Sequence, residues 1–139
     1  MKLKLRAWKK YDSPEMFRDI AFIDFNKKLL GVNYKVSKLT TRLDIETLDK
    51  FILMQSTGLK DKNGTEIYEG DIIANQNKEP ENWYISHHEV VWHDTGFMGK
   101  QICSSGSHIG LAHWTRGEGG YVVIGNIYEN PELLKGHEK

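Results

Sequence analysis

Strong charge bias and long apolar runs are both missing from this sequence. Its 139 residues carry 19 Lys and Arg against 19 Asp and Glu, which excludes a uniformly basic nucleic-acid coat and an acidic tail. No run approaches the roughly 18 apolar residues that a transmembrane helix needs. Residues 1–6 alternate apolar with charged side chains, whereas a signal peptide has a continuous apolar stretch. We therefore expect a soluble protein.

Cysteine is nearly absent as well. Cys103 is the only one, which excludes an intrachain disulfide and a Cys-rich zinc site and is typical of the reducing cytoplasm. Internal repeats and low-complexity tracts are also lacking. A hydrophobic content of 39% is ordinary for a globular chain, and the length suits one domain or two very small ones.

The zero net charge conceals a division of the chain. Residues 1–60 carry 13 basic and 7 acidic side chains, whereas residues 61–139 carry 6 basic and 12 acidic ones, giving net charges of +6 and −6. Opposite charges in two parts of one chain favour packing between domains or head-to-tail packing between subunits.

Short β-strands account for most of the patterns that are present. Residues 2–8 alternate apolar with polar side chains, which predicts a half-buried strand. Two apolar runs, 21–25 and 29–36, flank a polar turn and predict a hairpin. A compact apolar run at 51–54 predicts a buried strand.

Helix signals are few. Ser13 and Pro14 have the features of a helix cap and a first helical residue, so a short helix is predicted to begin there. Residues 44–50 are polar and predict a short helical turn or a loop. Residues 131–134 predict one closing helical turn.

Turn signals organise the second part of the chain. Asn63 and Gly64 tolerate the positive φ angles of a tight turn, and Gly70 precedes an apolar strand in the way that many small five-stranded barrels begin. Further strands are predicted at residues 83–93, 97–103, 108–114 and 121–127. Together with thirteen glycines, this pattern favours a mostly-β architecture with minor α structure.

Two blocks of sequence are distinctive. Residues 54–73, MQSTGLKDKNGTEIYEGDII, and residues 123–134, VIGNIYENPELL, resemble the two hallmarks of the YopX family of phage and prophage proteins. Residues 6–8 and 90–97 fall in the matching order before and between these hallmarks.

The resemblance implies a small β protein, encoded by phages or prophages of Gram-positive bacteria, whose C-terminal part is an SH3-type barrel. It implies no established biochemical activity. On this basis we divide the chain into an N-terminal β-rich subdomain, residues 1–53, and an SH3-like barrel, residues 54–139.

The hallmark residues have structural explanations. The glycines at 58, 64, 70 and 125 serve turns, and the side chains of Asn63 and Asp71 support loops by hydrogen bonds to the backbone. The residues that we assign to this scaffold are Gly58, Asn63, Gly64, Tyr68, Gly70, Asp71, Gly125, Asn126, Tyr128 and Pro131. They indicate a scaffold and no catalytic site.

Six histidines invite comparison with a metal site. They are His87, His88, His93, His108, His113 and His137. The spacing of five within the pairs 88/93 and 108/113 puts each pair on opposite faces of a regular strand, and no zinc-type ligand spacing is present. We expect these histidines, including those of the region 87–113, to face solvent or to be hydrogen-bonded, with no metal or other cofactor.

Other residues that carry chemistry give weaker signals. Asp61, Glu66, Glu69 and Asp71 lack the spacing of an EF-hand loop, and turn chemistry explains them better than cation binding. The serine-rich turn at 104–107 has no recognisable partner base. We therefore predict no catalytic residue, and a metal-dependent enzyme is the least favoured function.

The basic N-terminal part carries the best binding hypothesis. Cationic and aromatic side chains are interleaved there, as phosphate contact and base stacking require. They are Lys2, Lys4, Arg6, Trp8, Lys9 and Lys10, with Tyr11 beside them. On a strand, Lys2, Lys4 and Arg6 project to one side, and Trp8 continues that row. The alternative is that these charges solvate an exposed sheet face or pair with the acidic part of the chain.

Protein binding is the competing function. Four Trp and six Tyr supply aromatic surface for an interface, and Tyr68, Trp83, Tyr84 and Trp114 are candidates that fit a core equally well. We expect a non-enzymatic interaction module of a phage or prophage, in the cytoplasm of the bacterial host. Nucleic acid is the partner to test first, and a self-associating, adaptor or structural phage protein is the alternative. No membrane or small-molecule partner is indicated.

Overall fold

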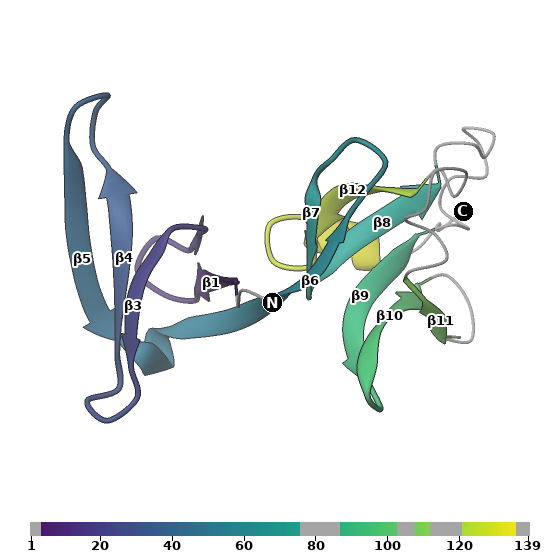
Figure 1. The fold of residues 1–139 in the computed structure, drawn as a ribbon, viewed down its shortest axis with the longest axis horizontal. Coiled ribbons are helices and arrows are strands. Elements are labelled where there is room, and N and C mark those ends of the chain that lie inside the picture. The colour runs from purple at the N-terminus through teal and green to yellow at the C-terminus, as the bar shows by residue number, and fades with distance from the viewer. Residues whose placement is uncertain (1–3, 76–86, 103–107, 112–120, 136–139) are drawn as a thin grey trace. The chain divides into compact units, whose positions relative to one another are not determined.

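The computed structural model describes residues 4–75, 87–102, 108–111 and 121–135, and almost all of its regular structure is β-strand. The expectation of a mostly-β fold with minor helix is therefore confirmed. The chain divides into two compact units, Met1–Gln55 (unit 1) and Ser56–Lys139 (unit 2). Strand β6, Phe51–Lys60, begins in unit 1 and ends in unit 2 (Figure 1).

Antiparallel pairing organises the described part of unit 1. Strand β1 lies between β2 and the first half of β6, and β4 lies between β3 and β5. The bounds are β1 Leu5–Lys9, β2 Glu15–Phe17, β3 Ile20–Asp24, β4 Leu29–Lys35 and β5 Thr41–Thr47. Figure 1 shows β3, β4 and β5 side by side, with the β4–β5 hairpin extending past the end of β3. The predicted hairpin at 21–25 and 29–36 is thereby confirmed.

The core of unit 1 joins residues from both of these sheets. Ala7, Leu30, Val32 and Phe51 are buried together, and Phe17 packs edge-on against Phe51 with 6.2 Å between the ring centroids. Leu30 and Val32 are two residues apart, so they point to the same face of the β3-β4-β5 sheet. This is the inner face of that sheet, and the opposite one is its outer face.

The helix predicted to begin at Ser13 is wrong. Asp12 and Ser13 have φ values of 54° and 70°, which suit a tight hairpin turn and no right-handed helix. The chain turns back there, and β2 pairs with β1 in the register Ala7↔Phe17. Burial of the Phe17 ring against the core outweighs the local capping signal, because helix propensity is only a weak preference.

Strand β5 replaces most of the helical turn or loop predicted at 44–50. Only Leu48–Lys50 form a short 3₁₀-helix. Each residue of β5 lies opposite a residue of β4, from the pair Lys35↔Thr41 to the pair Leu29↔Thr47. The buried face of β4 therefore imposes an extended conformation on a segment whose own sequence is polar.

Unit 2 contains a curled antiparallel sheet, preceded by a hairpin of the second half of β6 with β7, Glu66–Tyr68 (Figure 1). Across the sheet the strands are β11 His108–Gly110, β10 Gly96–Gln101, β9 His88–His93, β8 Asp71–Asn75 and β12 Tyr121–Asn126. The first four in the chain form a meander, and β12 returns to pair with β8. The predicted closing turn is present as a 3₁₀-helix, Pro131–Lys135. Parts of the strands predicted at 83–93, 97–103 and 108–114 lie outside the described residues.

Among the described residues of unit 2, a core cluster joins four buried side chains from β7, β8, β9 and the residue after β11. They are Ile67, Ile73, Val90 and Leu111, and Phe97 and Tyr121 pack partly buried against them. Ile72 of β8 is also completely buried.

Candidate functional site

The first hallmark block is organised by the buried carboxylate of Asp61. Its Oδ1 accepts hydrogen bonds from the backbone N–H groups of Asn63 and Thr65, at 2.9 and 2.8 Å. Its Oδ2 accepts a third, from the N–H of Val123 in β12, at 2.9 Å. One side chain therefore shapes the turn before β7 and ties it to the second hallmark block. The sequence assigned loop support to Asn63, whereas the supporting carboxylate belongs to Asp61 and Asn63 contributes its N–H.

The turn between β7 and β8 makes a second connection between the blocks. Asp71 Oδ2 accepts the N–H of Tyr68 at 2.8 Å, which is the side-chain-to-backbone bond expected of Asp71. Gly70 has a φ of 90°, a value that side-chain-bearing residues rarely adopt. Its N–H donates to Val90 O, and its carbonyl accepts from Ile127 N, at 2.8 and 2.9 Å.

The second hallmark block contains a similar polar centre. The buried Asn126 accepts hydrogen bonds at Oδ1 from the N–H groups of Tyr128 and Glu129, and its Nδ2 donates to Glu129 Oε1. Asn130 Oδ1 accepts from Asn126 N at 3.1 Å. Gly125 lies within β12 at a bulge rather than in the turn predicted for it. A Cβ at this position would collide with the Asn130 side chain, which favours glycine there.

The histidines lie in several different surroundings. His88 is buried with its ring edge-on to Tyr121 at 6.0 Å, whereas the His93 and His108 rings stack 3.8 Å apart. Burial lowers the pKa of His87, and the neighbouring His88 lowers it further. The described part of the chain contains no group of three or more His, Cys, Asp or Glu that could hold a metal ion. Cys103, His113 and His137 lie outside the described residues.

The predicted basic row on β1 does not form a uniform solvent-exposed surface. Arg6 is 1% exposed, opposite Met54 of β6, and Trp8 is half-buried. Lys9 Nζ lies 2.9 Å from Glu46 Oε2. Lys4 is exposed, while Lys2 lies outside the described residues.

A smaller cationic and aromatic surface follows β1. The Lys10 ammonium lies 5.3 Å from the centre of the Tyr11 ring, and Tyr11 is 57% exposed. Nucleic-acid contact by the basic row stays a prediction, with Lys4, Lys10 and Tyr11 as its accessible members.

The outer face of the β3-β4-β5 sheet is an apolar surface that the sequence did not reveal. Leu43 and Ile45 of β5 are each 50% exposed, and Phe22 of β3 is 37% exposed. Ile45 and Phe22 lie opposite Gly31 from either side, and the Phe22 ring covers the space where a Cβ at Gly31 would stand. Phe22 and Ile45 thus lie in one row across the three strands, and Leu43 extends this apolar surface along β5.

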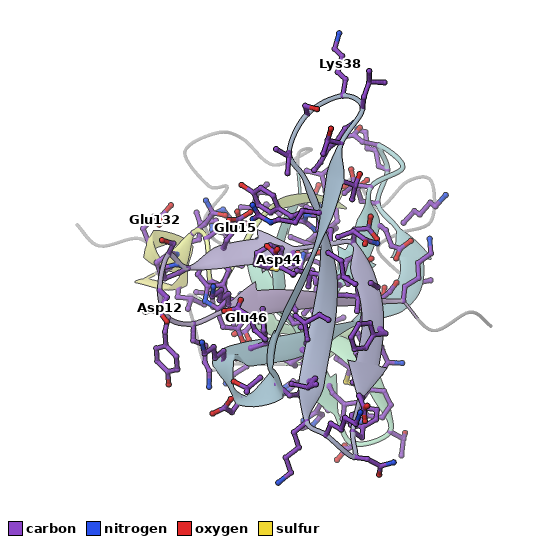
Figure 2. The ribbon with its side chains drawn as sticks, turned by 90° about the vertical axis from the view of Figure 1, so that its left-hand side faces the viewer. Asp12, Glu15, Lys38, Asp44, Glu46 and Glu132 are labelled. Atoms are coloured by element: carbon purple, nitrogen blue, oxygen red, sulfur yellow. The ribbon has the colours of Figure 1, made fainter. Side chains whose placement is uncertain are left out.

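The inner face of β5 carries charges instead. Arg42 makes a two-pronged contact with Asp44, Nε to Oδ1 at 2.6 Å and Nη2 to Oδ2 at 3.0 Å. Glu46 contacts Lys9 and Lys50, at 2.9 and 3.5 Å. The hydrogen bond from Lys9 holds the pKa of Glu46 below its ordinary value, and that from Arg42 does the same for the pKa of Asp44. Figure 2 shows Asp44 and Glu46 along this strand, with Lys38 at the tip of the hairpin.

The sequence contained one usable signal for this surface. Residues 42–46 alternate charged and apolar side chains, which is the pattern of a strand. The usual inference would bury Leu43 and Ile45, and the structure does the opposite. Lys9 and Lys50 neutralise Glu46 from elsewhere in the chain, so the charged side of β5 faces inward.

Fold and site together define a small two-unit β protein with a polar scaffold in unit 2 and an exposed apolar sheet face in unit 1. Within the described part of the chain, no helix is long and apolar enough to cross a membrane. The family model for YopX protein matches residues 4–135, and the chain belongs to the YopX family.

One solved structure is similar over almost the whole length of both chains. It is the crystal structure of protein EF1440 from Enterococcus faecalis, with 32% sequence identity and a TM-score of 0.70. The match covers 96% of this chain and 99% of that one. No curated protein matches this sequence.

Proposed function

We propose that this protein is a non-enzymatic protein-interaction module of a phage or prophage, acting in the cytoplasm of the bacterial host. The observation that carries the proposal is the outer face of the β3-β4-β5 sheet, where Phe22, Leu43 and Ile45 are exposed together. Grouped apolar side chains on a small soluble protein are typical of a binding surface. The phage setting is what the YopX resemblance implies.

Covering this face would supply useful binding energy. Leu43 and Ile45 are half exposed, and burying the remaining half of each side chain contributes about 1 kcal/mol. The charges on the inner face are engaged within unit 1, so a partner on the outer face need not desolvate them. A modest affinity centred on these apolar residues follows.

Unit 2 serves as the scaffold in this proposal. Its four-strand meander, with a last strand that returns to the first, supports an SH3-like barrel. The buried polar groups of the hallmark residues are used in hydrogen bonds to the backbone, as at Asp61 and Asn126. Their role in this account is to hold turns in place rather than to bind a ligand.

The test compares proteins cross-linked to the chain in host cells. The change Ile45→Arg should remove the specific cross-linked proteins, because it places a charge on the apolar surface. The matched control Leu134→Arg changes another exposed apolar residue, in unit 2, and should leave them in place. Circular dichroism checks that both variants fold. An identical set of cross-linked proteins for Ile45→Arg and the unchanged chain would refute the proposal.

A second candidate function is binding of single-stranded nucleic acid by Lys4, Lys10 and Tyr11. The specific observation is the exposed Tyr11 ring with the Lys10 ammonium over it, a combination that suits base stacking beside a phosphate. Replacing Lys4 and Lys10 by Ala should lower retention on single-stranded DNA and weaken its salt dependence. Unchanged retention would contradict this function. Arg6 is unsuitable for the test, because its substitution disturbs a buried position.

A further inference from the structure

Strand β5 is the terminal strand of its sheet among the described strands, and its backbone pattern shows which groups face the open edge. Val36 N donates to Thr40 O, and Leu48 N donates to Lys28 O. Hydrogen-bonded pairs alternate along an antiparallel ladder, so the even-numbered residues of β5 bond to β4. The N–H and C=O groups of Thr41, Leu43, Ile45 and Thr47 therefore point away from β4.

An open edge of this kind is a template for a further strand. Natural proteins block such edges with proline, bulges or charged side chains, and β5 contains no proline and no bulge. Its charged side chains, Arg42, Asp44 and Glu46, are engaged in ion pairs on the inner face. Among the described strands, none pairs with this edge of β5.

We propose that β5 pairs antiparallel with β5 of a second copy of this chain, with Leu43 opposite the partner's Leu43. This inference rests on the proposed function, in that it names the partner of the unit 1 surface. A two-fold axis through the Leu43 pair makes the contact self-complementary. It lets Thr41, Leu43 and Ile45 exchange main-chain hydrogen bonds with the partner's Ile45, Leu43 and Thr41.

Charge favours this register over the registers centred on Asp44 and on Ile45. With Leu43 on the axis, Arg42 lies opposite the partner's Asp44, and Asp44 lies opposite the partner's Arg42. An axis at Asp44 would place two Asp side chains opposite each other, and an axis at Ile45 would place Asp44 opposite the partner's Glu46. Like charges directly opposite are destabilising, whereas opposite charges stabilise the pair.

Side chains on the outer face support the same arrangement. Leu43 would contact the partner's Leu43, and Ile45 would lie beside the partner's Thr41. The two apolar surfaces would then join across a continuous six-stranded sheet. A second copy is favoured over an unrelated peptide because the segment Arg42-Leu43-Asp44, paired antiparallel with itself, places Arg opposite Asp at both ends.

The first test measures the self-association of the full chain by sedimentation equilibrium. Arg42→Asp and Asp44→Arg, made singly, each place like charges opposite each other and should weaken self-association by about tenfold or more. The double variant carrying both changes restores opposite charges at positions 42 and 44, both across the Leu43 register and within each chain, and should recover the association of the unchanged chain. Failure of the double variant to recover would overturn the register.

The second test separates the edge from the apolar face. Leu43→Pro removes an N–H that points to the open edge while sparing the bonds to β4, and should abolish self-association. Leu43→Thr keeps that N–H, removes apolar surface, and should leave most of the association. Thermal unfolding verifies that both variants fold.

The outcomes separate this inference from the proposed function. Pairing through β5 is overturned if the chain stays monomeric at all concentrations, or if the Leu43→Pro variant associates as strongly as the unchanged chain. If the Ile45→Arg variant nevertheless loses its cross-linked host or phage proteins, the interaction role stands and its partner is a different protein.

Discussion

At the scale of single residues, a few buried polar side chains hold the turns of unit 2 in place by hydrogen bonds to the backbone. Asp61 accepts three backbone N–H groups from two hallmark blocks that are 50 or more residues apart in the chain. Hydrogen bonds to a charged acceptor contribute more than neutral ones, and a buried donor left without its acceptor is costly. The hydrogen bonds that Asp61 accepts from buried backbone N–H groups therefore explain its place in the hallmark block.

Replacing Asp61 by Asn should destabilise the protein by about 1–3 kcal/mol, because an amide NH₂ would face backbone N–H donors. Chemical denaturation followed by tryptophan fluorescence measures the change. The control is Asp94→Asn, at a carboxylate that is 79% exposed, which should leave stability nearly unchanged. Equal effects of the two substitutions would contradict the role assigned to Asp61.

Glu46 gives unit 1 a pH-dependent contribution to stability. Its pKa is lowered from 4.5, first by the hydrogen bond from Lys9, so its contribution is present above that value and is lost as the pH falls through the lower folded-state pKa. Glu46→Gln should flatten the acidic limb of a plot of unfolding free energy against pH. An unchanged acidic limb in the variant would show that the ion pair contributes nothing measurable.

At the scale of elements, apolar patterns in the sequence predicted those strands well whose apolar side chains face the core. The hairpin of β3 with β4 and the start of β6 were found from apolar runs, and the turn at Asn63 and Gly64 from its residue types. The same reasoning missed β5, since its apolar residues face outward and Glu46 is neutralised in part by Lys9, which is distant in sequence. No local pattern encodes that neutralisation.

The incorrect helix at Ser13 has a similar origin. Ser13 followed by Pro14 and Glu15 satisfies a capping pattern, yet the same residues also fit a hairpin turn. The distant aromatic core, through Phe17 and Phe51, decides between the two structures. Contacts between residues that are distant in the sequence, such as Phe17 with Phe51, cannot be predicted from the local sequence.

The β1–β2 hairpin can be tested directly. Asp12 and Ser13 both have positive φ, which Asn and Gly adopt at lower cost. The double change Asp12→Asn with Ser13→Gly should raise the free energy of unfolding by about 0.5–1 kcal/mol. A helix beginning at Ser13 would instead lose its cap and be slightly destabilised. Thermal denaturation distinguishes the two signs.

At the scale of the whole molecule, the balanced charge conceals two units with different tasks. Unit 2 contains most of the family hallmark and uses its polar residues to hold turns together. Unit 1 uses several of its charges internally, through Lys9, Arg42 and Lys50, and leaves an apolar sheet face exposed. The composition shows that the charges are divided between the two parts of the chain. Which of these charges form ion pairs is known only from the pairing of the strands in the structure.

The most direct measurement mixes the two single-charge variants, Arg42→Asp and Asp44→Arg, and follows complex formation by native mass spectrometry. In the Leu43 register positions 42 and 44 of the mixed pair carry opposite charges on the two chains. Two variants that are each mainly monomeric should therefore form a one-to-one heterodimer. A mixture that stays as monomeric as its separate components would contradict interaction of unit 1 through β5.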